Sequence, residues 1–238
     1  MTTYTAADHD RSAAAPDAAG RRRPWAITGA VTGVLGIAAT LNLFAKSVYP
    51  EDGSTIGPGI VDGIDSAGTR VGFVLGYLTV AGLLVLGAQW RRHVEPRLPD
   101  STASRVLGNG LIASAAALTF GYGWMGALAL YSSGGPEAGS FDRTGLYVYF
   151  MLNDFGAFIG WLGVVVAAGA AAWMGLVERS LPLWIGIVSV LPVLGTLVMI
   201  VLTSVPGAPG LFGGVWLVVA FAGLALSRRP FTAGSRRA

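Results

Sequence analysis

The chain has 238 residues, of which 53% are hydrophobic and only 12% are charged, and its formal net charge is +3. A soluble domain carries about a quarter charged residues, so this composition excludes an ordinary soluble protein. The absence of cysteine also excludes a disulfide framework, a zinc–cysteine site, an iron–sulfur cluster and a thiol nucleophile. We therefore expect an integral membrane protein.

The first 24 residues are rich in Ala, Thr and Asp and show no apolar periodicity, so we expect a disordered tail. Three arginines, Arg21, Arg22 and Arg23, precede the first apolar run, as in a signal peptide. That run has about 22 residues, which is longer than a signal peptide's apolar region, and no A-x-A cleavage site follows it. We predict an uncleaved first membrane helix.

Six apolar runs follow, and each has roughly the 20 residues that a helix needs to cross about 30 Å of hydrocarbon. They lack the alternation of barrel strands, so we predict an all-α bundle of six transmembrane helices over residues 25–227. A short basic tail, residues 228–238, ends the chain. The runs are Trp25–Lys46, Val71–Trp90, Leu107–Tyr131, Tyr147–Met174, Leu183–Ser204 and Gly210–Ser227.

The distribution of basic residues predicts the orientation of the bundle. The two tails and the segments 91–106 and 175–182 carry thirteen basic residues. The opposite set of connections, with the adjoining helix end, carries three: Lys46, Arg70 and Arg143. Basic residues accumulate on the cytoplasmic side of membrane proteins. We expect a multi-pass protein of the cell membrane with both termini in the cytoplasm.

Pairs of glycines at four-residue spacing occur in three of the runs. This spacing places both glycines on one helix face and allows two helix backbones to approach closely. We expect packing between helices of one chain, with a dimer interface as the alternative. Gly175, just past the inner end of the fourth run, is expected to have free space around it. The pairs are Gly29 and Gly33, Gly72 and Gly76, and Gly156 and Gly160.

Asp154 is the one carboxylate inside a predicted span. A charge at the centre of a membrane helix costs at least about 2.5 kcal/mol on insertion scales, so such a residue usually faces the bundle interior and has a partner. We expect a polar cluster in the outer half of the bundle, with an ion pair to Lys46 or Arg143. The alternative is that Asp154 lies near the lipid headgroups and only anchors the bundle. The further candidates are Asn153, Asn42, Tyr77 and Tyr122.

Other patterns predict no cofactor, metal or nucleic-acid site. Residues 121–126 match the dinucleotide pattern G-x-G-x-x-G, but they lie inside an apolar run without the strand and helix start that a phosphate site requires. Asp62 and Asp65 lack the ligand frame of a calcium loop. The basic residues near Arg91 are explained by orientation in the membrane, so nucleic-acid binding is not expected. No catalytic residues are predicted.

The segment Gly145–Asp154, with Trp161–Gly163 and the turn Arg179–Gly186, resembles a type of uncharacterised multi-span membrane protein from high-GC actinobacteria. The resemblance covers roughly residues 105–227, and the bias toward Arg over Lys agrees with it. It implies a habitat and a topology, and it supplies no catalytic residues.

Three functions remain open from the sequence. The short loops and small-residue faces favour a small accessory or structural protein that packs against lipid, a membrane partner or a second copy. A polar cluster around Asp154 favours a transporter of a small solute, coupled to protons in one version. An apolar groove between helices is what a lipid- or quinone-binding protein needs.

Overall fold

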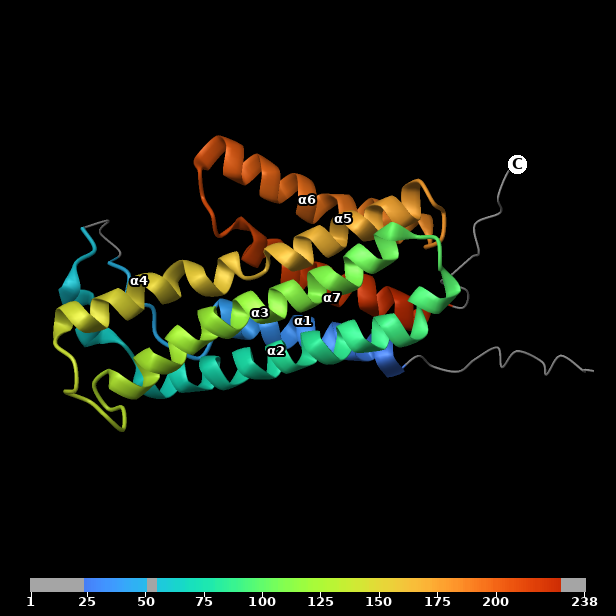
Figure 1. The fold of residues 1–238 in the computed structure, drawn as a ribbon. Helices are drawn as coiled ribbons and strands as arrows, with labels where there is room; N and C mark the ends of the chain where they lie inside the picture. The colour runs from blue at the N-terminus through green and yellow to red at the C-terminus, as the bar shows by residue number, and fades with distance from the viewer. Residues whose placement is uncertain (1–23, 51–54, 228–238) are drawn as a thin grey trace, which may run out of the picture.

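The computed structural model describes residues 24–50 and 55–227. The expected N-terminal and C-terminal tails lie outside this described part, except for Pro24, which begins the first helix. Within it the chain is all helical, and the helices run side by side along one long axis (Figure 1). They are α1 (Pro24–Thr40), α2 (Ser66–His93), α3 (Thr102–Tyr131), α4 (Arg143–Ile159), α5 (Leu162–Leu176), α6 (Leu183–Thr203) and α7 (Ala208–Leu226), with short 3₁₀ turns η1 (Pro58–Gly63) and η2 (Glu95–Arg97).

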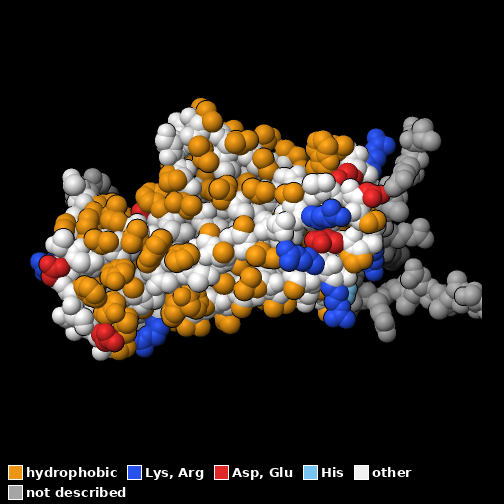
Figure 2. Space-filling view, in the orientation of Figure 1, with side chains coloured by type: hydrophobic (Ala, Val, Ile, Leu, Met, Phe, Trp, Pro, Cys, Tyr) orange, Lys and Arg blue, Asp and Glu red, His pale blue; other side chains and the backbone are white. Residues whose placement is uncertain are grey.

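Five helical stretches are long and apolar enough to cross a membrane, and α1 is a shorter apolar helix. The expected helical membrane bundle is therefore confirmed, with a count of five long spans and one short one. On the face that Figure 2 shows, charged side chains gather at the two ends of the long axis and hydrophobic side chains cover the surface between them. The long stretches are Ser66–Arg97, Thr102–Tyr131, Arg143–Leu176, Leu183–Thr203 and Ala208–Leu226.

The first helix ends at Thr40, six residues before the predicted end at Lys46. Asn42 adopts the left-handed conformation, with φ of 47°, which Asn tolerates better than most residues. The Leu43 N–H then donates to the Ala38 carbonyl and the Asn42 N–H to the Ala39 carbonyl, each at 3.1 Å. This Schellman pattern satisfies the last carbonyls of the helix. At 1.5 Å per residue, 17 residues span about 25 Å.

The predicted span Tyr147–Met174 also differs from the structure. It begins earlier, at Arg143, and it divides into α4 and α5 at Gly160 and Trp161. There the Trp161 N–H donates to the Phe158 carbonyl, three residues back, so the helix tightens locally. The sequence has no proline at this point, and hydrophobicity alone does not reveal the break.

Polar caps set the starts of α2, α3 and α4, which begin four or five residues before the predicted apolar runs. The Asp65 carboxylate accepts from the Ala67 N–H at 3.1 Å, the Ser101 hydroxyl from the Ser104 N–H at 3.0 Å, and the Asp142 carboxylate from the Gly145 N–H at 2.8 Å. Such caps satisfy backbone N–H groups that a helix start leaves open. Each of these three helices therefore begins before its hydrophobic run does.

Each glycine of the three predicted pairs lies against another part of the same chain. Gly29 and Gly33 of α1 face α7, where a Cβ on Gly33 would lie 2.7 Å from the Gly214 carbonyl. Gly72 and Gly76 of α2 face Asn42 and the Tyr122 ring. Gly156 and Gly160 face α3, against Trp124 and Leu118. The closest approach of α3 and α4 also uses Gly121, one of the glycines in the G-x-G-x-x-G pattern.

The expectation of free space at Gly175 is wrong. Gly175 is buried, and α5 crosses α6 there so closely that an added Cβ would lie 2.6 Å from the Gly186 Cα. Both residues are glycines, so the two backbones are in contact with no side chain between them. The residue spacing within one helix did not predict this contact because its partner glycine lies on the next helix.

We expect Gly175→Ala to lower the free energy of unfolding by about 1–3 kcal/mol, since the new methyl group meets backbone that has no rotamer to change. Gly169→Ala is the matched control in the same helix, where the new Cβ would meet only the Val193 Cγ2 at 3.5 Å. Melting temperatures in detergent compare the two variants. Equal losses would contradict close backbone packing between α5 and α6.

Candidate functional site

A buried hydrogen-bond network joins the end of α1 to the break between α4 and α5. The Trp161 indole N–H donates to the Thr40 hydroxyl at 2.8 Å, and the Thr40 hydroxyl lies 2.8 Å from the Tyr122 hydroxyl. All three side chains are buried, with Trp161 and Tyr122 fully so. Because unpaired polar groups are costly in such surroundings, the network fixes the two helix discontinuities against α3.

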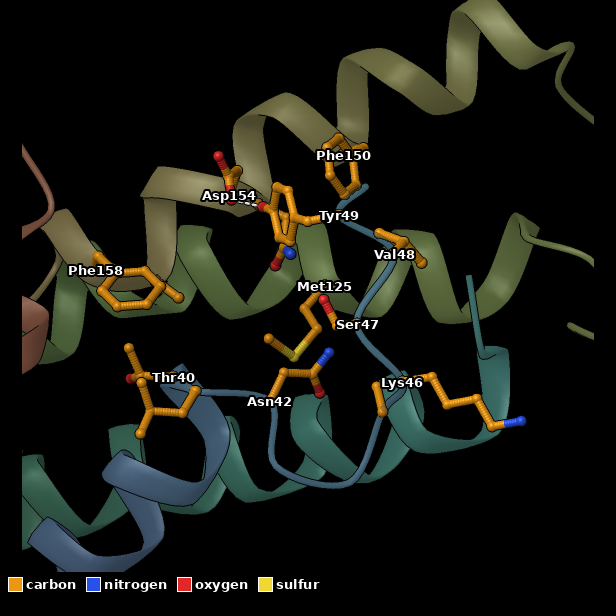
Figure 3. Close-up of a pocket in the computed structure, with 14 residues that line it drawn as sticks. Thr40, Asn42, Lys46, Ser47, Val48, Tyr49, Met125, Phe150, Asp154 and Phe158 are labelled. Atoms are coloured by element: carbon orange, nitrogen blue, oxygen red, sulfur yellow. Dashed lines mark hydrogen bonds between the residues drawn. The ribbon is translucent and has the colours of Figure 1, made fainter. Parts of the chain in front are cut away.

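A pocket of about 400 Å³ lies directly beside this network, and Thr40 belongs to its lining. One wall is the non-helical segment that follows α1, and the opposite wall is α4 (Figure 3). Met125 of α3 also contributes. The lining consists of Thr40, Leu41, Asn42, Ala45, Lys46, Ser47, Val48, Tyr49, Met125, Phe150, Asn153, Asp154, Ala157 and Phe158.

Asp154 accepts a hydrogen bond from the Tyr49 hydroxyl across the pocket (Figure 3). The Tyr49 ring also packs against Phe150, with ring centroids 5.9 Å apart. Burial raises the pKa of Tyr49 well above its ordinary value, and the hydrogen bond to Asp154 and the negative charge of Asp154 raise it further. Tyr49 therefore stays protonated at physiological pH and remains a donor to the carboxylate.

Two amide oxygens in the lining are buried without a hydrogen-bond partner among the described residues. They are the Oδ1 atoms of Asn42 and Asn153. Asn42 reaches its position because the left-handed turn that ends α1 directs it toward α2, where it lies over Gly72. Buried polar atoms are nearly always satisfied in proteins. Because the Asn42 Oδ1 faces Gly72 of α2, only the Asn153 Oδ1 remains as a candidate acceptor for a ligand or water in the pocket.

The depth of the pocket in the bundle follows from contacts between α2, α3 and α4. Twenty residues separate Arg70 from Arg91 on α2, or about 30 Å of helix, which matches the hydrocarbon thickness. Asn42 lies at Gly72, near the Arg70 boundary. Tyr122 packs on Gly76, and the neighbouring Gly121 packs on Gly156, so Asp154 lies at about the level of Gly76 along the bundle.

The structure brings together only part of the predicted polar cluster. Asp154, Asn153, Asn42 and Lys46 line the pocket, and Tyr122 contacts its lining residue Thr40. Tyr77 is exposed on α2 and packs against Phe73, with centroids 4.5 Å apart.

The partners of the charged groups differ from those expected. Arg143 pairs with Asp62, at 2.6 Å between Nη2 and Oδ2, on the exposed end of α4. The Lys46 ammonium points away from Asp154 (Figure 3). The recorded partner of Asp154 is the Tyr49 hydroxyl, so the ion pair expected for this carboxylate is replaced by a hydrogen bond to a neutral group.

Three site residues were missed from the sequence: Thr40, Tyr49 and Trp161. Thr40 and Trp161 lie in apolar runs, where the pattern indicates only burial. Tyr49 lies in the connection between the first two spans, which is long enough to fold back over the end of the bundle. A tyrosine in this connection could have been recognised as a site candidate, because its ring can be buried while its hydroxyl finds a hydrogen-bond partner.

The chain matches no protein-family model, and no curated protein or solved structure is detectably similar to it. The described residues also contain no group of three His, Asp or Glu side chains placed to hold a metal ion. The pocket lining itself contains acceptor oxygens, one carboxylate and aromatic side chains.

We expect Thr40→Val to lower the free energy of unfolding by about 1–3 kcal/mol, because the buried Trp161 N–H and Tyr122 hydroxyl lose their shared partner. Thr79→Val is the control: Thr79 is equally buried, but its hydroxyl donates at 2.9 Å to the Leu75 carbonyl of its own helix. Thermal melts of the two variants test this. A larger loss in Thr79→Val would contradict the structural role of the network.

The Tyr49 pKa provides a test that depends on pH. Since the folded pKa is raised above the ordinary value of 10.0, the folded state retains this proton longer than the unfolded chain. The stability gained is fully present below pH 10 and is lost as the pH rises toward the folded pKa. We expect the difference in ultraviolet absorbance between the unmodified chain and Tyr49→Phe to show a late tyrosine titration.

Asp154→Asn should move that titration to lower pH without restoring the ordinary value, because burial is the largest cause of the shift. The four proteins required are the unmodified chain, the two single variants and the double variant. A titration of Tyr49 that is identical with and without the Asp154 carboxylate would show that the two groups do not interact.

Proposed function

We propose that this chain is a membrane protein that binds a small solute in the pocket beside Asp154, in the manner of a transporter. The observation that carries the proposal is that α1 ends at a polar pocket, beside the junction of α4 and α5. α1 ends at Thr40, α4 ends beside Trp161, and the Trp161 indole is bonded to Thr40. Irregular backbone within a membrane protein is tolerated where it lines a cavity or is buried in protein.

Transporters place substrate sites where helices are discontinuous, because unwound backbone and inward-facing polar side chains are available there. The pocket has these features: a non-helical wall over residues 41–49, a carboxylate and the unpartnered amide oxygen of Asn153. These features favour solute binding over the accessory and quinone-binding hypotheses.

The orientation with both termini in the cytoplasm is part of this proposal. It rests on the excess of basic residues in the tails and at the Arg91, Arg105 and Arg179 end of the bundle. On this orientation the pocket opens toward the outside of the cell.

The natural chain has no cysteine, so single introduced cysteines report access to water directly. We expect Asn153→Cys, in the pocket, to react with a small membrane-impermeant thiol reagent added to intact cells. Leu152→Cys is the matched control: Leu152 is an exposed apolar residue on the same helix, and a thiol in apolar surroundings stays protonated and unreactive.

Thr102→Cys, at the start of α3 at the opposite end of the bundle, should react only after the membrane is permeabilised. Labelling of Thr102→Cys but not Asn153→Cys in intact cells would reverse the orientation. Protection of Asn153→Cys under both conditions would show a pocket closed to water and would refute solute binding there.

A further inference from the structure

We infer that the pocket takes a small organic ammonium ion whose charged group pairs with Asp154. This inference rests on the proposed solute-binding function of the pocket. Asp154 is the only acidic residue in the lining, and Lys46 is the only basic one. Because the Lys46 ammonium points away from Asp154 (Figure 3), the charge that faces the pocket is negative. Such a pocket attracts a cation and repels a carboxylate or phosphate ligand.

The hydrogen-bonding groups also match an ammonium group. The Asn153 Oδ1 is a buried acceptor without a partner among the described residues, and the Asp154 carboxylate offers further lone pairs beyond the one that Tyr49 uses. An alkylammonium carries three N–H donors and no acceptor. It satisfies these oxygens as a set, whereas a quaternary ammonium has no hydrogen to donate.

The walls of the pocket favour an organic cation over a bare metal ion. Three aromatic side chains, Tyr49, Phe150 and Phe158, line it with Met125 and Ala157. Aromatic faces attract cations, and Met and Ala provide contacts for an apolar substituent. The volume of about 400 Å³ lies within the range of roughly 300–1,000 Å³ found for small-molecule sites, and a single water takes only about 30 Å³.

Tyr49 competes with the ammonium group for Asp154. Its hydroxyl donates to one oxygen of the carboxylate, and its ring is held against Phe150 at 5.9 Å between centroids. An entering ammonium must share or replace this donor. Removing the hydroxyl while keeping the ring, as in Tyr49→Phe, therefore leaves the carboxylate more available to the ligand and keeps the aromatic wall.

The test is calorimetric binding to the purified full chain in lipid nanodiscs. The probes are phenethylammonium, the neutral phenylethyl alcohol, the anionic phenylpropionate, and the chlorides of sodium and potassium. We expect phenethylammonium to bind at least about tenfold more tightly than the alcohol or the carboxylate, which corresponds to about 1.4 kcal/mol. Asp154→Asn should remove this preference, and Tyr49→Phe should preserve or increase it.

Asp62→Asn is the matched control, because Asp62 lies at the same end of the bundle but pairs with Arg143 outside the pocket. It should leave phenethylammonium binding unchanged. Retained preference in Asp154→Asn, or loss of it in Asp62→Asn, overturns the assignment to Asp154.

The remaining outcomes separate this inference from the proposed function. Equal binding of the alcohol and the ammonium by the unmodified chain refutes a cation site while leaving a solute pocket. Tighter binding of phenylpropionate does the same. Heat from sodium or potassium alone assigns the site to an inorganic cation and refutes the organic one. No binding of any probe, together with an Asn153→Cys that does not react, refutes both proposals.

Discussion

The structure depends on the hydrogen bonds that backbone and buried polar groups make where α1 ends, before its predicted end. Lipid offers no hydrogen-bond partner, so a helix that ends inside a bundle needs an internal solution. In α1, Asn42 adopts the left-handed conformation. This allows the Asn42 and Leu43 N–H groups to donate hydrogen bonds to carbonyls in the last turn of the helix. The Thr40 hydroxyl, just before this turn, accepts a hydrogen bond from the Trp161 indole N–H.

Close glycine packing makes this arrangement possible over the rest of the bundle. α1 lies on α7 through Gly33 and Gly214, and α3 lies on α4 through Gly121 and Gly156. Where glycines meet, helix backbones touch and no large side chain separates them. The helices are therefore in close contact at these points. The space that remains lies toward one end, where α1 has already stopped and the chain crosses as an irregular segment.

The electrostatics of the pocket follow from the same geometry. Asp154 accepts a hydrogen bond from the hydroxyl of Tyr49, a group without charge. A carboxylate held by a neutral donor keeps its ability to pair with a cation, whereas one already bound to Lys46 or Arg143 would not. Arg143 pairs with Asp62 instead, on the exposed start of α4. Among the described residues, neither of the two cations expected beside Asp154 is therefore paired with it.

The sequence by itself determined the helical membrane class, because long apolar runs with few charges have no other stable form in lipid. It also singled out Asp154 and Asn153, because polar residues inside apolar runs are recognisable one at a time. The tertiary structure alone decided which of these groups meet. Tyr49 and Asp154 are 105 residues apart, and Thr40 and Trp161 are 121 apart. Hydrophobic periodicity carries no information on such distant pairs, or on the α5–α6 contact at Gly175 and Gly186, since helix order is set by packing between faces that look alike in sequence. Asn42 was a local indication in the sequence that α1 ends early. A single Asn within an apolar run ends a helix only when neighbouring helices provide partners for the irregular segment beyond it.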